Sequence, residues 1–296
     1  MISDLLPHLG RDQMQKTAAK VIEGESLNVL VGGLPVPEKD LENRFKLGVL
    51  ALLNKEYGIT ERDFLSAELE IVPACKARDV GFDRSFIGAY GQDDRVCAYT
   101  SLRALLDTTA QEKTVGILLF DKEETGSDGN TGAQSELYRF AINELQLKMK
   151  QQLSLEDIQA CYANTKLLSS DVCNAFDPNY PEVSEPMNSA YAGRGIGVNK
   201  YTGGGGKGGT TDCNAEYLHE ITRLFDEHDV SWQICELGKV DQGGGGTIAK
   251  YFANYGIQVL DCGVPVLSMH APFEVTSKAD VFETYCAYKC FMEHMK

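Results

Sequence analysis

The chain has 296 residues, 43% of them hydrophobic and 24% charged, which suits one large core or a large and a small domain. Its 28 basic and 43 acidic residues give a net charge of −15, which excludes nucleic acid as a main partner. No apolar run reaches the roughly 18 residues of a membrane span, so we expect no membrane partner.

The same sequence indicates where the protein works. Its start lacks a basic leader followed by an apolar core, so no signal peptide is expected. The nine cysteines are scattered and include no C-x-x-C pair. This pattern favours buried, inert thiols in a reducing cytoplasm over a zinc finger or a disulfide framework.

The first ~75 residues predict a smaller α+β domain. One helical segment, residues 44–58, lies between extended segments at 27–36 and 67–74. We place the boundary near Cys75, which gives domains 1–75 and 76–296.

The rest of the chain alternates helices with strands. Apolar residues at Val96, Tyr99, Leu102 and Leu106 have helical spacing and predict a helix over 93–107, while the apolar run 114–119 predicts a fully buried strand. The alternation predicts an α/β fold with a mainly parallel sheet covered by helices. The remaining predicted elements are helices over 134–149, 214–228 and 247–255, a last helix that Ser277 can cap with Asp280 three residues on, and strands within 165–171, 195–202, 231–237 and 257–264.

Polar clusters follow several predicted strands or open the next helix. In open α/β sheets ligands bind beyond the carboxyl ends of the strands, so these clusters should meet at one edge. Carboxylates plus a histidine are ligands for zinc, cobalt or manganese, which would offset the negative charge and activate water. The residues collected in this way are Asp93, Asp94, Glu123, Glu124, Asp171 and His270.

Each residue also has a simpler interpretation. The pair Glu123 and Glu124 could be solvated surface, and Asp93 and Asp94 could cap the following helix. His270 could be an ordinary hydrogen-bonded histidine. If the metal hypothesis holds, adjacent glutamates can divide the work, because one can bind metal while its neighbour takes the water proton.

The glycine cluster around Lys207 does not fit a phosphate-binding loop. Tyr201 stands where a glycine is required, and Gly208 replaces the Ser or Thr that should follow Lys207. A glycine-rich strand end could instead let a substrate backbone approach closely, with Lys200, Lys207 and Thr210 to Asp212 bordering the pocket and Gly209 as a further substrate-binding candidate. A mobile turn without a ligand is the alternative.

Six segments together resemble the aspartyl aminopeptidase family of two-zinc exopeptidases, in its bacterial form. The resemblance implies that Asp93 bridges two zinc ions, that Glu124 and His270 bind one, that Asp171 binds the other, and that Glu123 is the general base. The segments, in chain order, are "GAYGQDDRVCAYTSL", "DKEETGSDGNTGAQS", "SSDVCNAFDPNYPE", "KYTGGGGKGGTTDCNAE", "GGGTIAKYFANYG" and "DCGVPVLSMHAPFE".

The family resemblance also implies an organisation. It implies an α/β peptidase domain with an inserted dimerisation domain, and homo-oligomers, usually dodecamers. This chain resembles the family from within that inserted domain, so we expect the N-terminal part of the peptidase domain and one metal-binding histidine to be absent and the second zinc site to be weakened. His8, in "PHL", would contact substrate in a neighbouring subunit or be a surface histidine.

Two functions compete at this point. The first is a metal-dependent aminopeptidase that removes N-terminal residues, possibly Asp or Glu, from peptides through a metal-activated water, with Lys200 or Lys207 as candidates for recognising an acidic side chain. The second is an N-terminally truncated, inactive or weakly active fragment or partner of such an enzyme.

Overall fold

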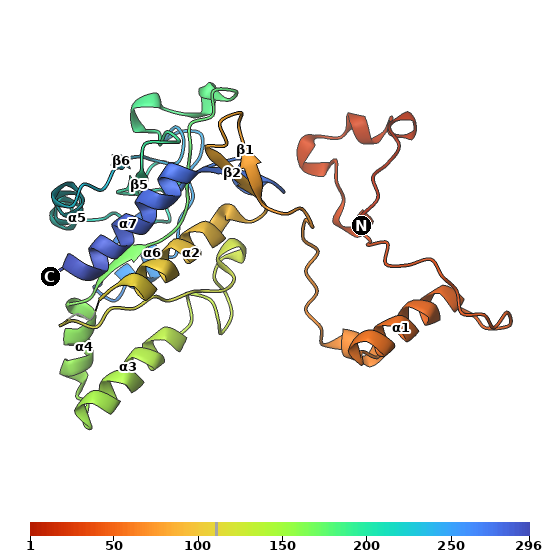
Figure 1. Ribbon diagram of the computed structural model, residues 1–296, viewed down its shortest axis with the longest axis horizontal. Helices are drawn as coiled ribbons and strands as arrows, with labels where there is room; N and C mark the ends of the chain where they lie inside the picture. The colour runs from red at the N-terminus through yellow and green to blue at the C-terminus, as the bar shows by residue number, and fades with distance from the viewer. Residues whose placement is uncertain (110–111) are drawn as a thin grey trace. The chain divides into compact units, whose positions relative to one another are not determined.

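The structure is a computed structural model that describes residues 1–109 and 112–296. It divides into two compact units, Met1–Val72 and Pro73–Lys296 (Figure 1). No helix within the described residues combines the length and the apolarity that a membrane crossing requires.

The first unit contains one α-helix, α1 (Arg44–Tyr57), as predicted. Gly58 ends it in the left-handed conformation (φ 72°) and donates its backbone N–H to the Asn54 carbonyl at 2.9 Å. The predicted strands are wrong: residues 1–72, all described, hold no strand and only an isolated bridge between Ile2 and Val29. Neither extended segment finds a neighbouring strand to share its backbone hydrogen bonds.

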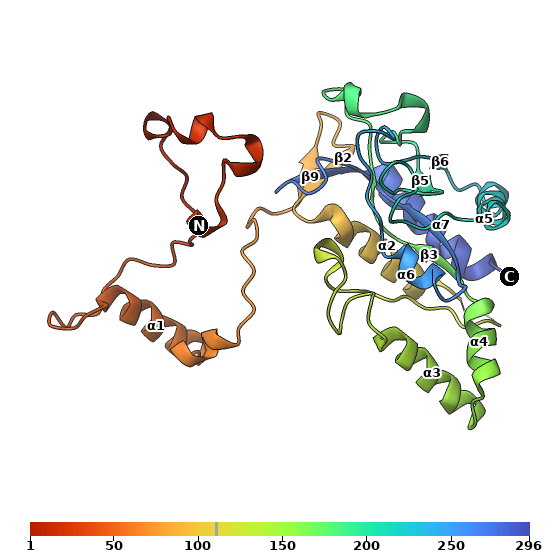
Figure 2. The same ribbon diagram turned by 180° about the vertical axis from the view of Figure 1, so that it is seen from behind.

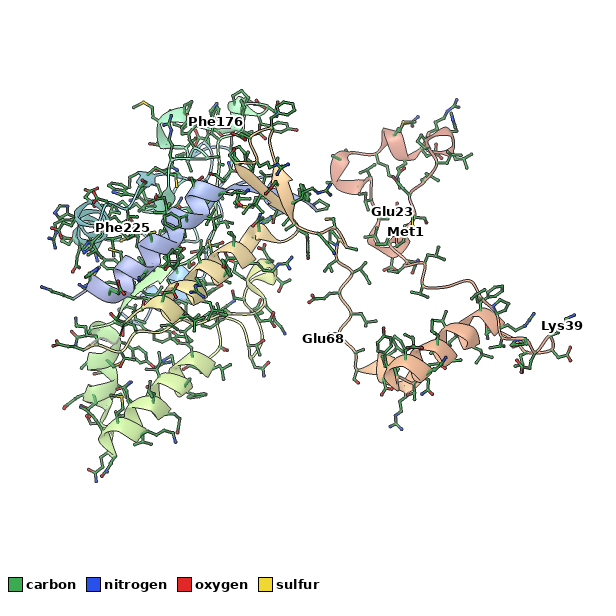
Figure 3. All side chains as sticks on the ribbon, in the orientation of Figure 1. Met1, Glu23, Lys39, Glu68, Phe176 and Phe225 are labelled. Atoms are coloured by element: carbon green, nitrogen blue, oxygen red, sulfur yellow. The ribbon has the colours of Figure 1, made fainter. Side chains whose placement is uncertain are left out.

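The first unit also lacks a core. None of its hydrophobic side chains is buried, whereas Phe225 of the second unit is fully buried among densely packed side chains (Figure 3). The assignment of residues 1–75 as a dimerisation-type domain stays a prediction.

The second unit confirms the α/β class. Each predicted helix is present to within a few residues, one further helix, at 155–163, was not predicted, and four of the strands fall inside predicted ones. The helices are α2 (Gln92–Asp107), α3 (Leu137–Lys150), α4 (Leu155–Ala163), α5 (Ala215–Glu227), α6 (Ala249–Ala253) and α7 (Lys278–His294); the strands are β1 (Arg78–Val80), β2 (Phe86–Ala89), β3 (Lys166–Ser169), β4 (Cys173–Asn174), β5 (Ile196–Asn199), β6 (Trp232–Ile234), β7 (Gln258–Gly263), β8 (Pro265–Leu267) and β9 (Glu274–Ser277).

The strands form two mixed sheets, with orders β1-β2-β9-β8-β4 and β3-β7-β5-β6. Three of the seven pairings among the described strands are parallel, so the prediction of a mainly parallel sheet is wrong. Short connections turn β1 back onto β2 and β8 back onto β9, and such connections can only join antiparallel strands. These short strands gave no clear pattern in the sequence.

The main core lies between α5, α7 and the strands β5 and β7. Asn214 begins α5 by accepting a hydrogen bond from the Tyr217 backbone N–H at 2.7 Å, and the helix then buries Ile221 and Phe225 against Ile196 of β5. Helices α2 and α7 run side by side in both views (Figures 1 and 2). This packing holds α2 against α7 within the second unit.

The apolar run 114–119 is not a strand. Val115 and Ile117 pack against the core, but Leu118 and Leu119 are 46% and 63% exposed. No strand within the described residues pairs with this segment, so it has no ladder to join. The prediction of a fully buried strand there is wrong.

The start of α7 also differs from the expected cap. Ser277 precedes the helix but makes no side-chain cap bond. Asp280, fully buried, instead accepts the backbone N–H groups of Gly193 and Gly195 at 2.7 and 2.8 Å. This carboxylate therefore joins α7 to the loop before β5.

The cysteines behave as predicted. All nine lie within the described residues and are free thiols, and six of them are buried. Burial raises the pKa of the Cys97 and Cys262 thiols well above its usual value, so these groups stay protonated and unreactive.

Replacement of Phe225 by alanine tests the core. We expect the free energy of unfolding to fall by about 3–5 kcal/mol, because the change leaves a cavity among fully buried neighbours. Urea denaturation of the full chain measures it. Phe282, 60% exposed on α7, is the control, and its alanine variant should stay within about 0.5 kcal/mol of the wild type. Equal losses in the two variants would contradict the proposed core.

Candidate metal centre

Asp93 and His270 reach one edge of a sheet from parallel strands. Both β2 and β8 run antiparallel to β9, which lies between them, so their carboxyl ends lie at the same edge. Asp93 lies four residues beyond the end of β2 in a non-helical conformation (φ −81°, ψ 112°), and His270 lies three residues beyond β8 with φ 65°. The strand-end argument thus brings these two residues together.

Glu124 comes from a short 3₁₀ turn, η6 (Glu123–Thr125). Left-handed residues on both sides, Lys122 (φ 67°) and Gly126 (φ 97°), reverse the chain around the turn. His270 Nε2 lies 3.0 Å from Asp93 Oδ2 and 3.3 Å from Glu124 Oε2. One ligand atom from each of the three residues lies within 4.8 Å of the others, so all three can contact a common ion.

A second group shares Asp93. Ligand atoms of Asp93, Asp94 and Asp171 also lie within 4.8 Å of one another. The helix-cap interpretation is not supported, because Gly91 is the N-cap of α2 and no side chain makes a cap bond there. The family resemblance gives Asp94 no role as a ligand, and its adjacency to Asp93 is its main signal in the sequence.

The electrostatics of these acids favour a cation. Burial, followed by the nearby Glu124 charge, raises the pKa of Asp93 to about 7. Burial and neighbouring carboxylates also raise the pKa of Asp94 and of Asp171 well above the usual range. Asp94 Oδ1 is buried without a hydrogen-bond partner. A divalent cation would favour the ionised forms and supply the missing partner, so these residues fit a metal site.

Glu123 differs from its neighbour in its surroundings. Its side chain is half-buried, whereas Glu124 is exposed. Burial, followed by the Glu124 charge, raises the pKa of Glu123 above its usual value. Glu123 belongs to neither of the two ligand groups among the described residues, which leaves its carboxylate available for proton transfer.

The other histidines lie outside the two groups. His228 and His294 stack on each other with ring centroids 4.1 Å apart, and His219 is exposed on α5. His8 is exposed in the 3₁₀ turn η1 (Pro7–Leu9) of the first unit, and its role stays a prediction. The second acid group contains no imidazole within the described residues.

Both candidate substrate-binding lysines are paired. Lys200 forms an ion pair with Asp212 and donates to the Cys213 carbonyl at 2.7 Å. Lys207 lies 2.7 Å from the second Asp212 oxygen and 4.7 Å above the Tyr201 ring. Their role in substrate binding stays a prediction.

The glycines of the two clusters pack on each other. A Cβ on Gly244 would lie 2.2 Å from the Gly203 carbonyl oxygen, and one on Gly246 would lie 2.4 Å from that of Gly209. The Gly245 backbone N–H also donates to the Thr202 carbonyl at 2.8 Å. Close contact between two loops therefore accounts for the absence of side chains here.

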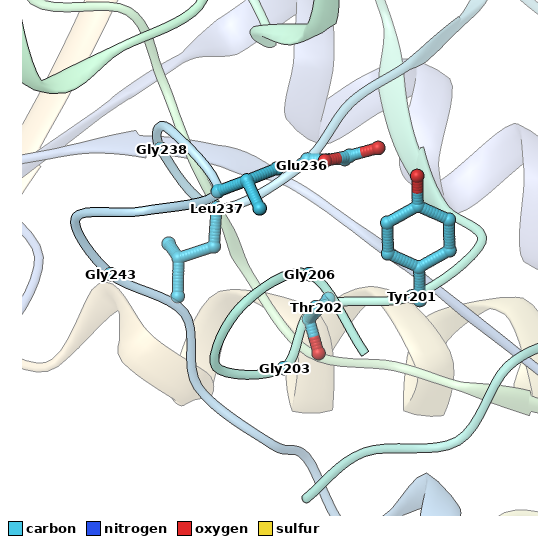
Figure 4. Close-up of a pocket in the computed structure, with 9 residues that line it drawn as sticks. Tyr201, Thr202, Gly203, Gly206, Glu236, Leu237, Gly238 and Gly243 are labelled. Carbon is cyan, nitrogen blue, oxygen red and sulfur yellow. The ribbon is translucent and has the colours of Figure 1, made fainter. Parts of the chain in front are cut away.

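A pocket lies beside these loops (Figure 4). Tyr201 and Glu236 face each other across it, and their hydrogen bond raises the pKa of Tyr201. Its volume of about 10 Å³ is close to that of a single water molecule, which is too small for an amino-acid side chain. Lys200, Lys207 and Gly209 do not line this pocket.

The carboxylates of Asp93 and Glu124 and the imidazole of His270, next to the Glu123 carboxylate outside both ligand groups, form the donor set of a metallohydrolase. The chain belongs to the M18 family, whose model is described as aminopeptidase I zinc metalloprotease and matches residues 1–292. The resemblance to the aspartyl aminopeptidase family is thereby confirmed.

Relatives and solved structures agree with this family. A probable M18 family aminopeptidase 1 from Clostridium acetobutylicum is 52% identical over 293 residues, which cover 99% of this chain. The crystal structure of the M18 aminopeptidase from Thermotoga maritima has a TM-score of 0.93 at 48% identity. That of aminopeptidase I from C. acetobutylicum has a TM-score of 0.90 at 51% identity. Each structural match covers 99% of this chain.

The coverage of the relatives is partial. The chain spans 63% of the C. acetobutylicum relative and 64% of the T. maritima structure. The family match itself extends from residue 1 to residue 292, so it does not support the expected loss of the N-terminal part of the domain.

Proposed function

We propose that this protein is a zinc-dependent aminopeptidase that removes N-terminal residues from peptides. The observation that carries the proposal is the convergence of Asp93, Glu124 and His270, whose ligand atoms lie within 4.8 Å of one another. Family membership supplies the reaction class. Because the chain spans less than two thirds of these relatives, the activity of the whole protein is part of the proposal.

The residues have separate roles in this proposal. Asp93, Glu124 and His270 would hold one zinc ion and leave a coordination position open. A bound zinc ion supplies positive charge that polarises the scissile carbonyl and makes water a better nucleophile. Glu123, half-buried beside Glu124, would accept the proton from that water and pass it to the leaving amine.

The second group would bind metal more weakly. Asp93, Asp94 and Asp171 offer only carboxylate oxygens, whereas zinc prefers sites that include nitrogen or sulfur. Oxygen ligands suit manganese better, and cobalt or manganese could occupy this site in place of zinc. The expected result is unequal binding of two ions to sites that share Asp93.

Substrate preference and assembly complete the proposal. An acidic N-terminal residue would have to compete with Asp212 for Lys200 or Lys207, and Gly209 would border its path. A distant solved structure, 22% identical, is described as a yeast dodecamer. A homo-oligomer of this chain in the cytoplasm, with His8 contacting substrate of a neighbouring subunit, is consistent with the exposed hydrophobic side chains of residues 1–72 and the free thiols.

Removal of metal tests the proposed function. We expect the full chain to hydrolyse an aspartyl-anilide, to lose turnover in a chelator, and to regain it with zinc, because no residue in the proposed mechanism replaces the charge of the ion. Release of the aniline measures the rate, and a glutamyl- and a leucyl-anilide measure preference. Hydrolysis that persists after complete metal removal would rule out the mechanism.

A further inference from the structure

We propose that Glu274 is a positioning residue that holds the backbones of Asp93 and His270 where both side chains can reach one ion. This inference rests on the proposed function, because it concerns the same metal centre. Glu274 is the first residue of β9 and is only 2% exposed. It belongs to neither ligand group among the described residues.

The contacts of Glu274 join the two ligand loops. Its Oε2 accepts the Asp93 backbone N–H at 3.0 Å, and its Oε1 accepts the His270 backbone N–H at 2.8 Å. Asp93 and His270 are 177 positions apart in the chain, yet one carboxylate bridges them. Both oxygens of the buried group are thereby used.

The sheet explains why this residue reaches both loops. β9 lies between β2 and β8 and runs antiparallel to each. Its first residue, Glu274, pairs with Ala89, the last residue of β2. The start of β9 therefore lies at the edge where β2 and β8 release the chain towards Asp93 and His270.

The backbone N–H groups of Asp93 and His270 need a hydrogen-bond acceptor from elsewhere in the chain. His270 has φ 65°, a left-handed conformation that is uncommon for a residue with a Cβ. Asp93 departs from helical geometry within the first turn of α2. Both N–H groups take part in partly buried hydrogen bonds to Glu274, and a partly buried N–H needs a partner. The Glu274 carboxylate satisfies both and fixes the two conformations relative to each other.

A carboxylate is suited to this task for a chemical reason. It offers an acceptor oxygen to each N–H, whereas the amide of glutamine has one oxygen and an NH₂ group that would face the second N–H. Glu274→Gln keeps the size of the side chain but breaks one of the two contacts. Loss of such a supporting partner typically weakens metal affinity by about 10- to 100-fold.

Asp280 provides a matched control. It is also a fully buried carboxylate that accepts two backbone N–H groups, from Gly193 and Gly195, but it belongs to neither ligand group. Asp280→Asn should therefore cost stability without changing the metal centre. A difference in zinc affinity between the two variants would separate the loss of ligand positioning from a general loss of stability.

The experiment is a zinc titration of the full chain against a competing chromophoric chelator, with urea unfolding of the metal-free protein in parallel. We expect Glu274→Gln to weaken the tighter zinc site by about 10- to 100-fold. We expect Asp280→Asn to retain the wild-type affinity while its unfolding midpoint falls. Glu274→Asp keeps both oxygens on a shorter side chain, so its zinc affinity should lie between those of the wild type and Glu274→Gln. It replaces the glutamine variant if that variant does not fold.

Two results would overturn the inference. One is wild-type zinc affinity in Glu274→Gln, and the other is an equal loss in Glu274→Gln and Asp280→Asn. A wild-type chain that binds no zinc would instead refute the proposed function and, with it, this inference.

Discussion

Asp93→Asn is expected to empty both metal sites at once. Within the described part of the chain, Asp93 alone is common to the two ligand groups, and an asparagine amide carries no charge and only one acceptor oxygen. Because the loss of a mere supporting partner costs up to about 100-fold in metal affinity, the loss of this shared ligand should cost more at each site. Metal content by mass spectrometry after dialysis against dilute zinc measures the result.

The stability of the metal-free protein shows whether Asp93→Asn has lost a metal ligand or has unfolded. Burial and nearby charge raise the pKa of Asp93 to about 7, so its ionised form is unfavourable in the metal-free protein at neutral pH. Removing the charge should leave the metal-free variant at least as stable as the metal-free wild type. Asp128→Asn, in an exposed part of the loop that contains Glu123, is the control and should bind zinc normally. Zinc bound to Asp93→Asn at the wild-type ratio would exclude the shared-ligand arrangement.

Glu123→Gln is expected to lower kcat by about 10²- to 10⁴-fold while both metal sites stay filled. Glutamine has nearly the same shape but cannot accept the proton from the attacking water. Glu123 belongs to neither ligand group, so metal affinity should not change. Anilide hydrolysis and metal content, measured on the same sample, check the two halves of this expectation.

The adjacent residue provides the contrast. Glu124→Gln should release zinc from the site that contains His270, because Glu124 supplies one of its three ligand atoms. Glu182 is an exposed carboxylate, and Glu182→Gln should change neither the turnover number nor the metal content. Unchanged turnover in Glu123→Gln, or metal loss in that variant, would show that the two glutamates do not divide the work as proposed.

The sequence predicted which side chains lie close together better than it predicted the sheets. The clusters that contain Asp93 and His270 do meet at one edge of a sheet, as expected for ligands beyond the carboxyl ends of strands, but β2 and β8, the strands that precede them, are not among the predicted strands. Glu124 joins them from a 3₁₀ turn, because the apolar run before it is not a strand. The strands β1, β2, β8 and β9 are only three or four residues long, too short for a periodic pattern.

Other parts of the site could not be predicted for a different reason. Glu274 opens a short strand, and nothing in "EVTS" shows that its carboxylate is buried or that it meets two loops from elsewhere in the chain. The pairing of Lys200 and Lys207 with one aspartate also depends on tertiary contacts. The local sequence pattern indicates which side chains could take part in binding or catalysis. Contacts between distant parts of the chain decide which of these side chains are already paired with other residues.

The contact between the two glycine loops has a consequence for sequence change. Gly244 adopts φ 127° and faces the Gly203 oxygen, so even alanine there meets both an unfavourable backbone and a collision. Gly246 faces the Gly209 oxygen in the same manner. Neither loop can therefore accept a side chain at the contact unless the backbone of the other loop shifts. No second substitution can make room, because the facing atoms are backbone oxygens of residues that are already glycine.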